Sequence, residues 1–171
     1  MAKTGTVPGV NLPAISTVLA RQGDVVAAYL FGSLARGQAG PLSDIDIAAL
    51  LTPALEEQAA VERQLDLMVA LDALDPREMQ VTLLNHAPPA LAYQVLRDGI
   101  LFYERSQPQR IGFEVRAMQR YFDVQPMLDF HAQVLMQQIQ EVGLARRRDR
   151  DTRALEAAER IQQRLEAMAG R

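Results

Sequence analysis

The chain has 171 residues, which is enough for one well-buried domain and too few for two of ordinary size. Lysine and arginine number 18 and aspartate and glutamate 21, so the net charge of −3 argues against a protein that coats nucleic acid or binds membranes through basic residues. Hydrophobic residues make up 49% and charged residues 23%, which excludes a disordered chain. The lack of cysteine excludes disulfide scaffolds, thiol catalysis and cysteine-ligated metals.

The charge is unevenly distributed along the chain. Residues 1–144 carry ten basic and sixteen acidic groups, whereas residues 145–171 carry eight arginines and five acids. Residues 146–153 hold five of these arginines, and we favour a solvated linker or helix start there over a contact with RNA phosphates or an acidic partner. Residues 1–13 lack the apolar run of a signal peptide, and no stretch approaches the ~20 apolar residues of a membrane span. We expect a cytoplasmic protein with no membrane partner and no direct nucleic-acid binding.

Apolar spacing and turn residues predict alternating helices and strands. Apolar runs of strand length beside glycine or proline predict buried strands, and apolar residues three or four apart predict helices. The predicted elements are a helix over 13–22, a strand over 25–31, at most one helical turn within 34–43, a strand over 44–51, a helix from about 53 to 74, a strand over 79–84 and a helix over 88–99. In the helix that ends near residue 74, Val61, Leu65 and Met68 recur at helical spacing and mark its apolar face.

The remaining third of the chain is predicted to be mainly helical. Residues 100–103 form a short apolar segment that is either an edge strand or a turn of extended chain. From Gln109 we expect helix to the end, interrupted near Pro126 and Gly143. The last helix has an apolar stripe, which packs either on its own domain or on a partner helix. The stripe consists of Leu155, Ala158, Ile161, Leu165 and Met168.

Two aspartates stand two residues apart in the predicted strand over 44–51. Because side chains alternate between the faces of a strand, Asp44 and Asp46 point to one side while Ile45 points to the core. Neighbouring carboxylates repel each other unless a cation lies between them. The pair suits Mg²⁺, which takes one or two protein carboxylates and completes its shell with water and phosphate. For an isolated Asp-x-Asp, turn or surface acids are the alternative.

Gly32 and Ser33 directly follow the preceding strand, in a position to bind an anion. Glycine lets the backbone turn tightly and lets a phosphate approach the main chain, and the Ser33 hydroxyl adds a donor. Arg36 is close in sequence, and its guanidinium suits phosphate oxygens. An ordinary strand-to-loop turn is the simpler interpretation of Gly32-Ser33 alone. Gly37 and Gly40 keep the following residues loop-like, so the anion site and the acid pair can converge.

Together these residues resemble the signature of a known superfamily. The pattern consists of Gly32-Ser33, ten further residues that include Arg36-Gly37 and Ser43, and then Asp44-Ile45-Asp46. It is similar to the signature of the DNA polymerase β-type nucleotidyltransferases, and most similar to the minimal nucleotidyltransferases (MNT) that act as antitoxins of HEPN-domain RNases. The resemblance extends over about residues 25–143 and includes further stretches at 83–89, 96–103 and 121–123.

This resemblance implies a polymerase β-like α/β fold, with a small mixed sheet flanked by helices. We expect a nucleotidyltransferase domain over 1–106 and a helical extension over 107–171 that packs on the same domain. The implied activity is transfer of AMP from ATP to a tyrosine hydroxyl of a partner HEPN RNase. Two Mg²⁺ ions, or Mn²⁺ in their place, would be held by the catalytic residues Asp44 and Asp46. The expected nucleotide-binding residues are Gly32, Ser33, Arg36 and Ser43.

One position departs from the family pattern. The family places a third carboxylate on the next strand, where this chain has Gln80. Glutamine offers a carbonyl oxygen to a metal, but it has no charge and accepts no proton at neutral pH. Glu78 lies two residues earlier on the same face and could substitute. The alternatives are therefore an active transferase, a degenerate nucleotide-binding antitoxin that acts by contact alone, and a transferase that modifies a small molecule such as an aminoglycoside.

The two histidines of the chain carry no site of their own. His86 follows the strand predicted over 79–84, and His131 follows Pro126 in the C-terminal helical region. Because they lie in different segments, they build neither a metal cluster nor a serine–histidine triad. We expect both to be loop, surface or packing residues.

Overall fold

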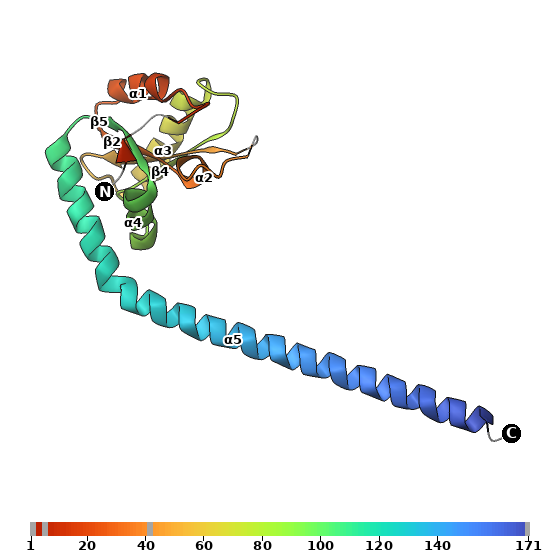
Figure 1. The fold of residues 1–171 in the computed structure, drawn as a ribbon. Coiled ribbons are helices and arrows are strands. Elements are labelled where there is room, and N and C mark those ends of the chain that lie inside the picture. Colours follow the sequence, from red (N-terminus) through yellow and green to blue (C-terminus); the bar gives the residue numbers. More distant parts are fainter. Residues whose placement is uncertain (1–2, 5–6, 41–42, 170–171) are drawn as a thin grey trace. The chain divides into compact units, whose positions relative to one another are not determined.

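The computed structural model describes the backbone of residues 3–4, 7–40 and 43–169, and the surroundings of the side chains of residues 7–40 and 43–139. Its contacts divide the chain into two compact units, Met1–Val124 and Gln125–Arg171, which we call the first and second units. The sheet lies in the first unit (Figure 1). The predicted boundary after residue 106, and the packing of residues 107–171 on the domain, stay predictions.

The sheet of the first unit is mixed, with the strand order β1-β5-β2-β3-β4. Its strands are β1 Lys3–Thr4, β2 Val25–Phe31, β3 Ile45–Leu51, β4 Met79–Leu83 and β5 Ile100–Glu104. β2 is antiparallel to both of its neighbours, whereas β1 pairs in parallel with β5 and β3 pairs in parallel with β4. The helices are α1 Leu12–Arg21, α2 Gly32–Ala35, α3 Glu57–Asp72, α4 Pro89–Asp98 and α5 Gln107–Ala169. The small mixed sheet with flanking helices and a helical C-terminal part is the fold that the sequence predicted.

The segment 100–103 belongs to an interior strand, so both expectations for it, an edge strand and a turn of extended chain, are wrong. β5 pairs with β2 on one side and with β1 on the other, where Lys3 lies opposite Ile100. The two-residue β1 was not predicted, because so short a strand leaves no periodic pattern in the sequence. Without β1, β5 would be the edge strand that the sequence suggested.

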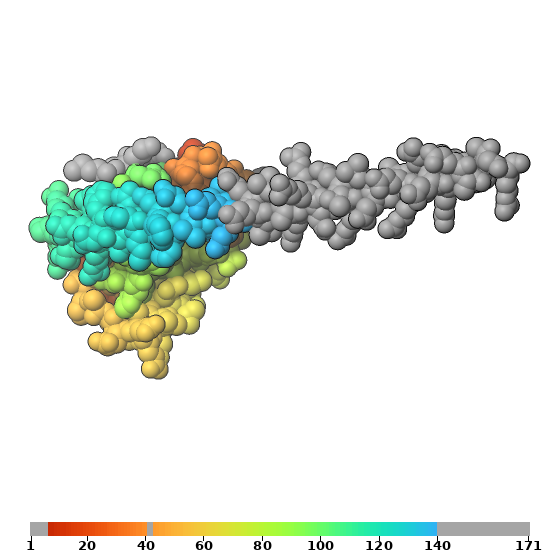
Figure 2. Space-filling model, turned by 90° about the horizontal axis from the view of Figure 1, so that it is seen from below, coloured from red at the N-terminus to blue at the C-terminus, as the bar shows by residue number. Residues whose placement is uncertain are grey.

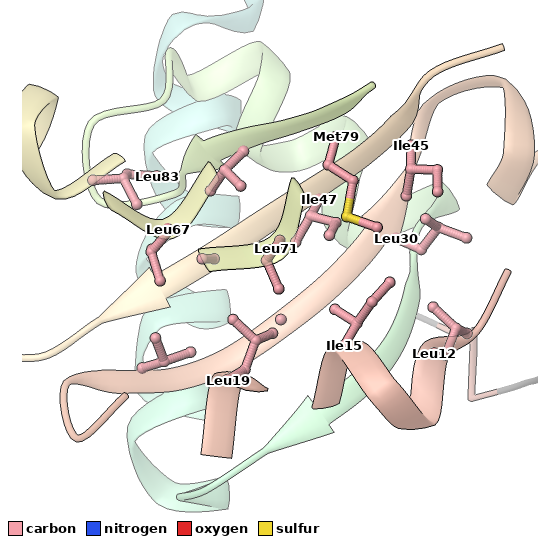
Figure 3. Close-up of a cluster of buried hydrophobic side chains, with 14 of the residues drawn as sticks. Leu12, Ile15, Leu19, Leu30, Ile45, Ile47, Leu67, Leu71, Met79 and Leu83 are labelled. Atoms are coloured by element: carbon pink, nitrogen blue, oxygen red, sulfur yellow. The ribbon is translucent and has the colours of Figure 1, made fainter. Parts of the chain in front are cut away.

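The sheet is covered on both faces, which explains the uninterrupted apolar run of β2. On one face α1 and α3 enclose the larger hydrophobic cluster. Figure 3 labels the side chains that these two helices contribute, namely Leu12, Ile15, Leu19, Leu67 and Leu71. On the other face, Val95 of α4 and Phe113 of α5 pack against Tyr29 of β2 and Ala48 of β3. β2 and β3 are therefore packed against helices on both faces of the sheet.

Helix α3 buries a different face from the one expected. Val61 and Leu65 are 57% and 56% exposed, whereas Leu67 and Leu71 are fully buried and Met68 is partly buried. Figure 2 shows α3, in yellow, at the surface of the described chain. The sequence contains two apolar stripes at helical spacing on this helix, and periodicity alone cannot choose which of them meets the sheet.

A buried tyrosine fastens the beginning of α5 to the sheet. Tyr29 is fully buried in β2, and its hydroxyl donates a hydrogen bond of 2.8 Å to Oε1 of Glu114. The guanidinium of Arg110 donates to the same carboxylate oxygen at 2.7 Å and also pairs with Glu104 of β5. Burial, reinforced by the Glu114 carboxylate, raises the pKa of Tyr29, so the phenol stays protonated and keeps donating.

Helix α5 runs without a break through both residues at which the sequence predicted an interruption. Pro126 lies inside the helix, and the helix continues through Gly143 to Ala169. Proline has a φ compatible with the helix and removes one hydrogen bond at a cost of ~3 kcal/mol, and glycine costs ~1 kcal/mol, so both can be tolerated in a long helix.

The side chains of the arginine-rich segment 146–153 lie outside the described residues. No helix within the described part of the chain is both long and apolar enough to span a bilayer.

The assignment of the buried face of α3 predicts unequal effects for two leucines of the same helix. Leu71→Ala should lower the free energy of unfolding by about 3 kcal/mol, because it leaves a cavity in the core. Leu65→Ala should change it by no more than about 0.5 kcal/mol, because this side chain is already hydrated. Denaturant titration of both variants measures the difference, and equal losses would contradict the assignment.

Candidate functional site

The Gly-Ser and Asp-x-Asp motifs meet at one end of the sheet, where β2 ends and β3 and β4 begin. In the antiparallel pair of β2 and β3, Phe31 lies opposite Asp46. In the parallel pair of β3 and β4, Asp46 lies opposite Gln80. The register therefore brings Gly32, which follows Phe31, and Gln80 to the two sides of Asp46. Three segments that are far apart in the sequence form one site.

The end of β2 touches the second aspartate because residue 32 has no side chain. Gly32 has φ +73°, in the left-handed region that favours glycine. A Cβ added at Gly32 would lie 1.9 Å from Oδ2 of Asp46 and 2.8 Å from its Cγ. The carboxylate of Asp46 thus occupies the space that any other residue at position 32 would fill. The expected convergence of the two motifs is a direct packing contact.

The two aspartates point to the same side of the sheet, as strand alternation predicted. Ile45 and Ile47 are fully buried in the core, whereas Asp44 and Asp46 are partly exposed. Burial raises the pKa of Asp46, and the negative charge of Asp44 raises it further. The guanidinium of Arg36 acts in the opposite direction and lowers the pKa of Asp46. Among the residues that the structure describes, the site is therefore short of positive charge, since one arginine faces two carboxylates.

Gln80 lies opposite Asp46 on β4, at the position where the resemblance to the family predicted a third carboxylate. Its side chain is exposed, and its Nε2 donates a hydrogen bond of 3.3 Å to Oδ2 of Asp44. Glu78 contributes its backbone carbonyl, which accepts from the amide of Ile45 at 2.9 Å. Across the described part of the chain, no cluster of three or more acidic, histidine or cysteine side chains is arranged to hold a metal. Glu78 therefore does not join the two aspartates as a third carboxylate.

The other three expected nucleotide-binding residues surround this pair differently. Ser33 is the second residue of the single-turn helix α2, and Arg36 is the exposed residue that ends it. Ser43 closes a turn of the loop, because its Oγ accepts from the amide of Gly40 at 2.9 Å and its own amide donates to the Gly40 carbonyl at 3.1 Å. Arg36 is thus close enough to act on the charge of Asp46, Ser33 directly follows Gly32, and the observed contacts of Ser43 shape the loop that precedes Asp44.

The donor set of the site fits a divalent metal such as Mg²⁺. Two adjacent carboxylates supply the hard oxygen ligands that this ion prefers, and a cation would relieve the repulsion that raises the pKa of Asp46. Because only Asp44 and Asp46 provide charged oxygens, the remaining ligands would have to come from water and from a phosphate-bearing substrate.

Sequence reasoning missed one contact of the site and placed one histidine correctly outside it. The hydrogen bond from Gln80 to Asp44 was not foreseen, although the alternation of β4 already put Gln80 on the carboxylate face. His86 is exposed and follows the end of β4, whereas the site lies at the start of that strand. His86 therefore belongs to the opposite end of the sheet, as a surface residue of the loop.

The family of the chain follows from a match to its central region. Residues 14–108 match the model of the family described as polymerase beta nucleotidyltransferase. This range is more than half of the chain and contains the whole site, so the chain belongs to this nucleotidyltransferase family. No curated protein matches the chain.

Several solved structures of toxin–antitoxin complexes contain a chain with the same fold. A toxin–antitoxin complex with AMP-PNP has a chain that is 27% identical, with a TM-score of 0.60, and the match covers 74% of this chain and 99% of that one. In a tyrosine-to-alanine mutant of the MntA toxin–antitoxin complex, the matching chain is 25% identical with a TM-score of 0.62, and the match covers 74% of this chain and 98% of that one. In a complex of a tri-AMPylated HEPN toxin with an MNT antitoxin from Shewanella oneidensis, the matching chain is 26% identical with a TM-score of 0.55, and the match covers 74% of this chain and 96% of that one.

The contact between Gly32 and Asp46 predicts different effects for two glycines that both have positive φ. Gly37 has φ +68° but nothing within 4 Å of an added Cβ. Gly37→Ala should therefore lower the free energy of unfolding by about 1 kcal/mol through backbone strain alone. Gly32→Ala should cost clearly more, because it adds the collision with Asp46.

A double variant separates the collision from the strain. Combining Gly32→Ala with Asp46→Ala removes the clashing carboxylate and should recover the excess loss, leaving a cost close to that of Gly37→Ala. Denaturant titration of the native chain, of Gly32→Ala and Asp46→Ala alone, and of the double variant gives the coupling. An unchanged excess in the double variant would show that Asp46 is not the group in contact.

Proposed function

We propose that this chain is an MNT antitoxin that transfers AMP from ATP to a tyrosine of a partner HEPN RNase, with Mg²⁺ as cofactor. The observation that carries the proposal is the packing of Asp46 into the space left by Gly32, beside Asp44. It joins an anion-binding turn to a pair of metal-binding carboxylates, which is what chemistry on a triphosphate requires. The AMP-PNP complex and the AMPylated toxin among the neighbours support the nucleotide and the acceptor.

The transfer is a displacement at the α-phosphorus of ATP. A bond forms between the tyrosine oxygen and the α-phosphorus while the bond to the β-phosphate oxygen breaks. Pyrophosphate leaves, and the proton of the tyrosine hydroxyl passes to solvent. Mg²⁺ bound at this site would supply positive charge opposite the triphosphate and the developing charge of the transition state.

The residues of the chain hold and orient the reactants in this proposal. Asp44 and Asp46 would hold the metal, which also relieves their mutual repulsion. The backbone at Gly32 and the hydroxyl of Ser33 would hold phosphate oxygens at the end of β2. Arg36 lies close enough to influence Asp46 and would pair with a phosphate of the same substrate.

Gln80 favours a second candidate function, an antitoxin that inhibits its partner by contact alone. An amide cannot take the proton of the attacking hydroxyl at neutral pH. In the structure the Gln80 amide donates to Asp44, so it orients that carboxylate and adds no negative charge to the site. The two candidates differ in one observable, which is whether the native chain forms AMPylated toxin.

The first test removes the charge of both aspartates while keeping their shape. Asp44→Asn with Asp46→Asn should lower Mg²⁺-dependent transfer of labelled AMP to the RNase by at least roughly a hundredfold, because the metal loses its charged ligands. Asp72→Asn, an exposed aspartate at the end of α3, is the control and should transfer AMP at the native rate. Native transfer by the double variant would exclude the assignment of these residues.

The second test introduces the carboxylate that the family pattern would supply. Gln80→Asp should raise the transfer rate by about tenfold, because it adds a charged oxygen and a proton acceptor beside Asp44. Thr82→Asp is the matched control, since it places a carboxylate on the same strand two residues further from Asp44 and should not accelerate transfer. If the native chain binds the RNase but forms no labelled product, and only Gln80→Asp does, the contact-only function is the correct one.

A further inference from the structure

The second unit, Gln125–Arg171, is about as long as the part of the chain that the structural neighbours leave unmatched. About three quarters of this chain covers 96–99% of each neighbouring chain in the toxin–antitoxin complexes. The quarter left unmatched corresponds in size to the second unit, and the family match ends at residue 108, well before it. Those chains form their complexes without an equivalent segment, so the second unit should serve another purpose.

The described part of the second unit exposes an unusual amount of apolar side chain. Six large apolar residues between 127 and 139 are 37–62% exposed, namely Met127, Leu128, Phe130, Leu135, Met136 and Ile139. A single helix has no core in which to bury such residues, so a helix of this kind is normally covered by another apolar surface. The question is which surface covers it.

The spacing of these residues indicates a pairing helix. Leu128, Ala132, Leu135 and Ile139, followed by Val142 in the sequence, are separated by alternating steps of four and three residues. This is the heptad spacing with which one helix packs along another, and a heptad face fits an identical face. Met127 and Phe130 lie on a different side of the helix and are not part of this face. We call the four residues from Leu128 to Ile139 the seam.

The charges of this segment also favour an identical copy as the partner of the seam. Asp129 is the one acidic or basic residue between 127 and 139, apart from His131, so two copies can lie together without like charges along the seam. The same helix continues to Ala169, but the second apolar stripe of its sequence, from Leu155 to Met168, falls at heptad positions on the opposite side from the seam and is not part of this contact.

We propose that the chain forms a dimer in which the seam of α5 packs against the seam of a second copy. The residues of this contact belong to the second unit and include none of the residues assigned to the nucleotidyltransferase site. It requires neither nucleotide nor toxin, so it can be tested apart from the proposed enzymatic activity.

The test measures the mass of the full chain in solution. Sedimentation equilibrium at micromolar concentrations, without nucleotide or toxin, should give twice the monomer mass of 19.0 kDa. Leu135→Glu with Ile139→Glu should give the monomer mass and weaken association at least tenfold, because it places charges in the seam. Gln133→Glu with Gln137→Glu is the control, since it adds the same charge on the opposite side of the helix and should leave the dimer intact. Circular dichroism of all three proteins verifies that their helix content is equal.

Two results would overturn the proposal. A native chain that stays monomeric over the whole concentration range would mean that the seam is covered by its own domain or by a different protein, such as the RNase. A dimer that persists in the Leu135→Glu, Ile139→Glu variant with unchanged affinity would place the contact elsewhere on the chain.

Discussion

The site of this protein depends on one close contact, in which the carboxylate of Asp46 fills the space where a side chain at position 32 would be. The contact requires that the end of β2 and the start of β3 lie in one register, with Phe31 opposite Asp46. That register is held because β2 is paired on both edges and covered on both faces. A strand buried in this way cannot slide by one residue without moving every side chain to the opposite face, where the core has a different shape, so the core determines where the carboxylates stand.

The same arrangement places two carboxylates that repel each other at one end of the sheet. Burial and the charge of Asp44 both raise the pKa of Asp46, and among the described residues the opposing cation is Arg36, which follows the one-turn helix α2. Two repelling carboxylates lower the stability of the free protein, and a cation bound between them would restore it. The protein tolerates this cost because hydrophobic clusters on both faces of the sheet bury the side chains of β2 and β3.

Gln80 adds an uncharged amide to the site, and this amide donates a hydrogen bond to Asp44. Its hydrogen bond keeps Asp44 oriented while adding no negative charge to a site that already has too much. A metal held by two carboxylates depends more heavily on the phosphates of its substrate for ligands. Binding of the metal and of the nucleotide should therefore be strongly coupled at this site.

The sequence by itself determined the main elements and the positions of the two motifs, because apolar periodicity, glycine and paired aspartates act locally. It predicted that Asp44 and Asp46 share a face and that Gln80 follows on the next strand, since alternation along a strand is a local property. Three features were decided only by the tertiary structure: the face of α3 that is buried, the interior place of β5, and the contact of Gly32 with Asp46. Each of these features depends on a contact with a segment that is distant in the chain. A local sequence pattern carries no information about which segment that will be, or which side of the element it will cover.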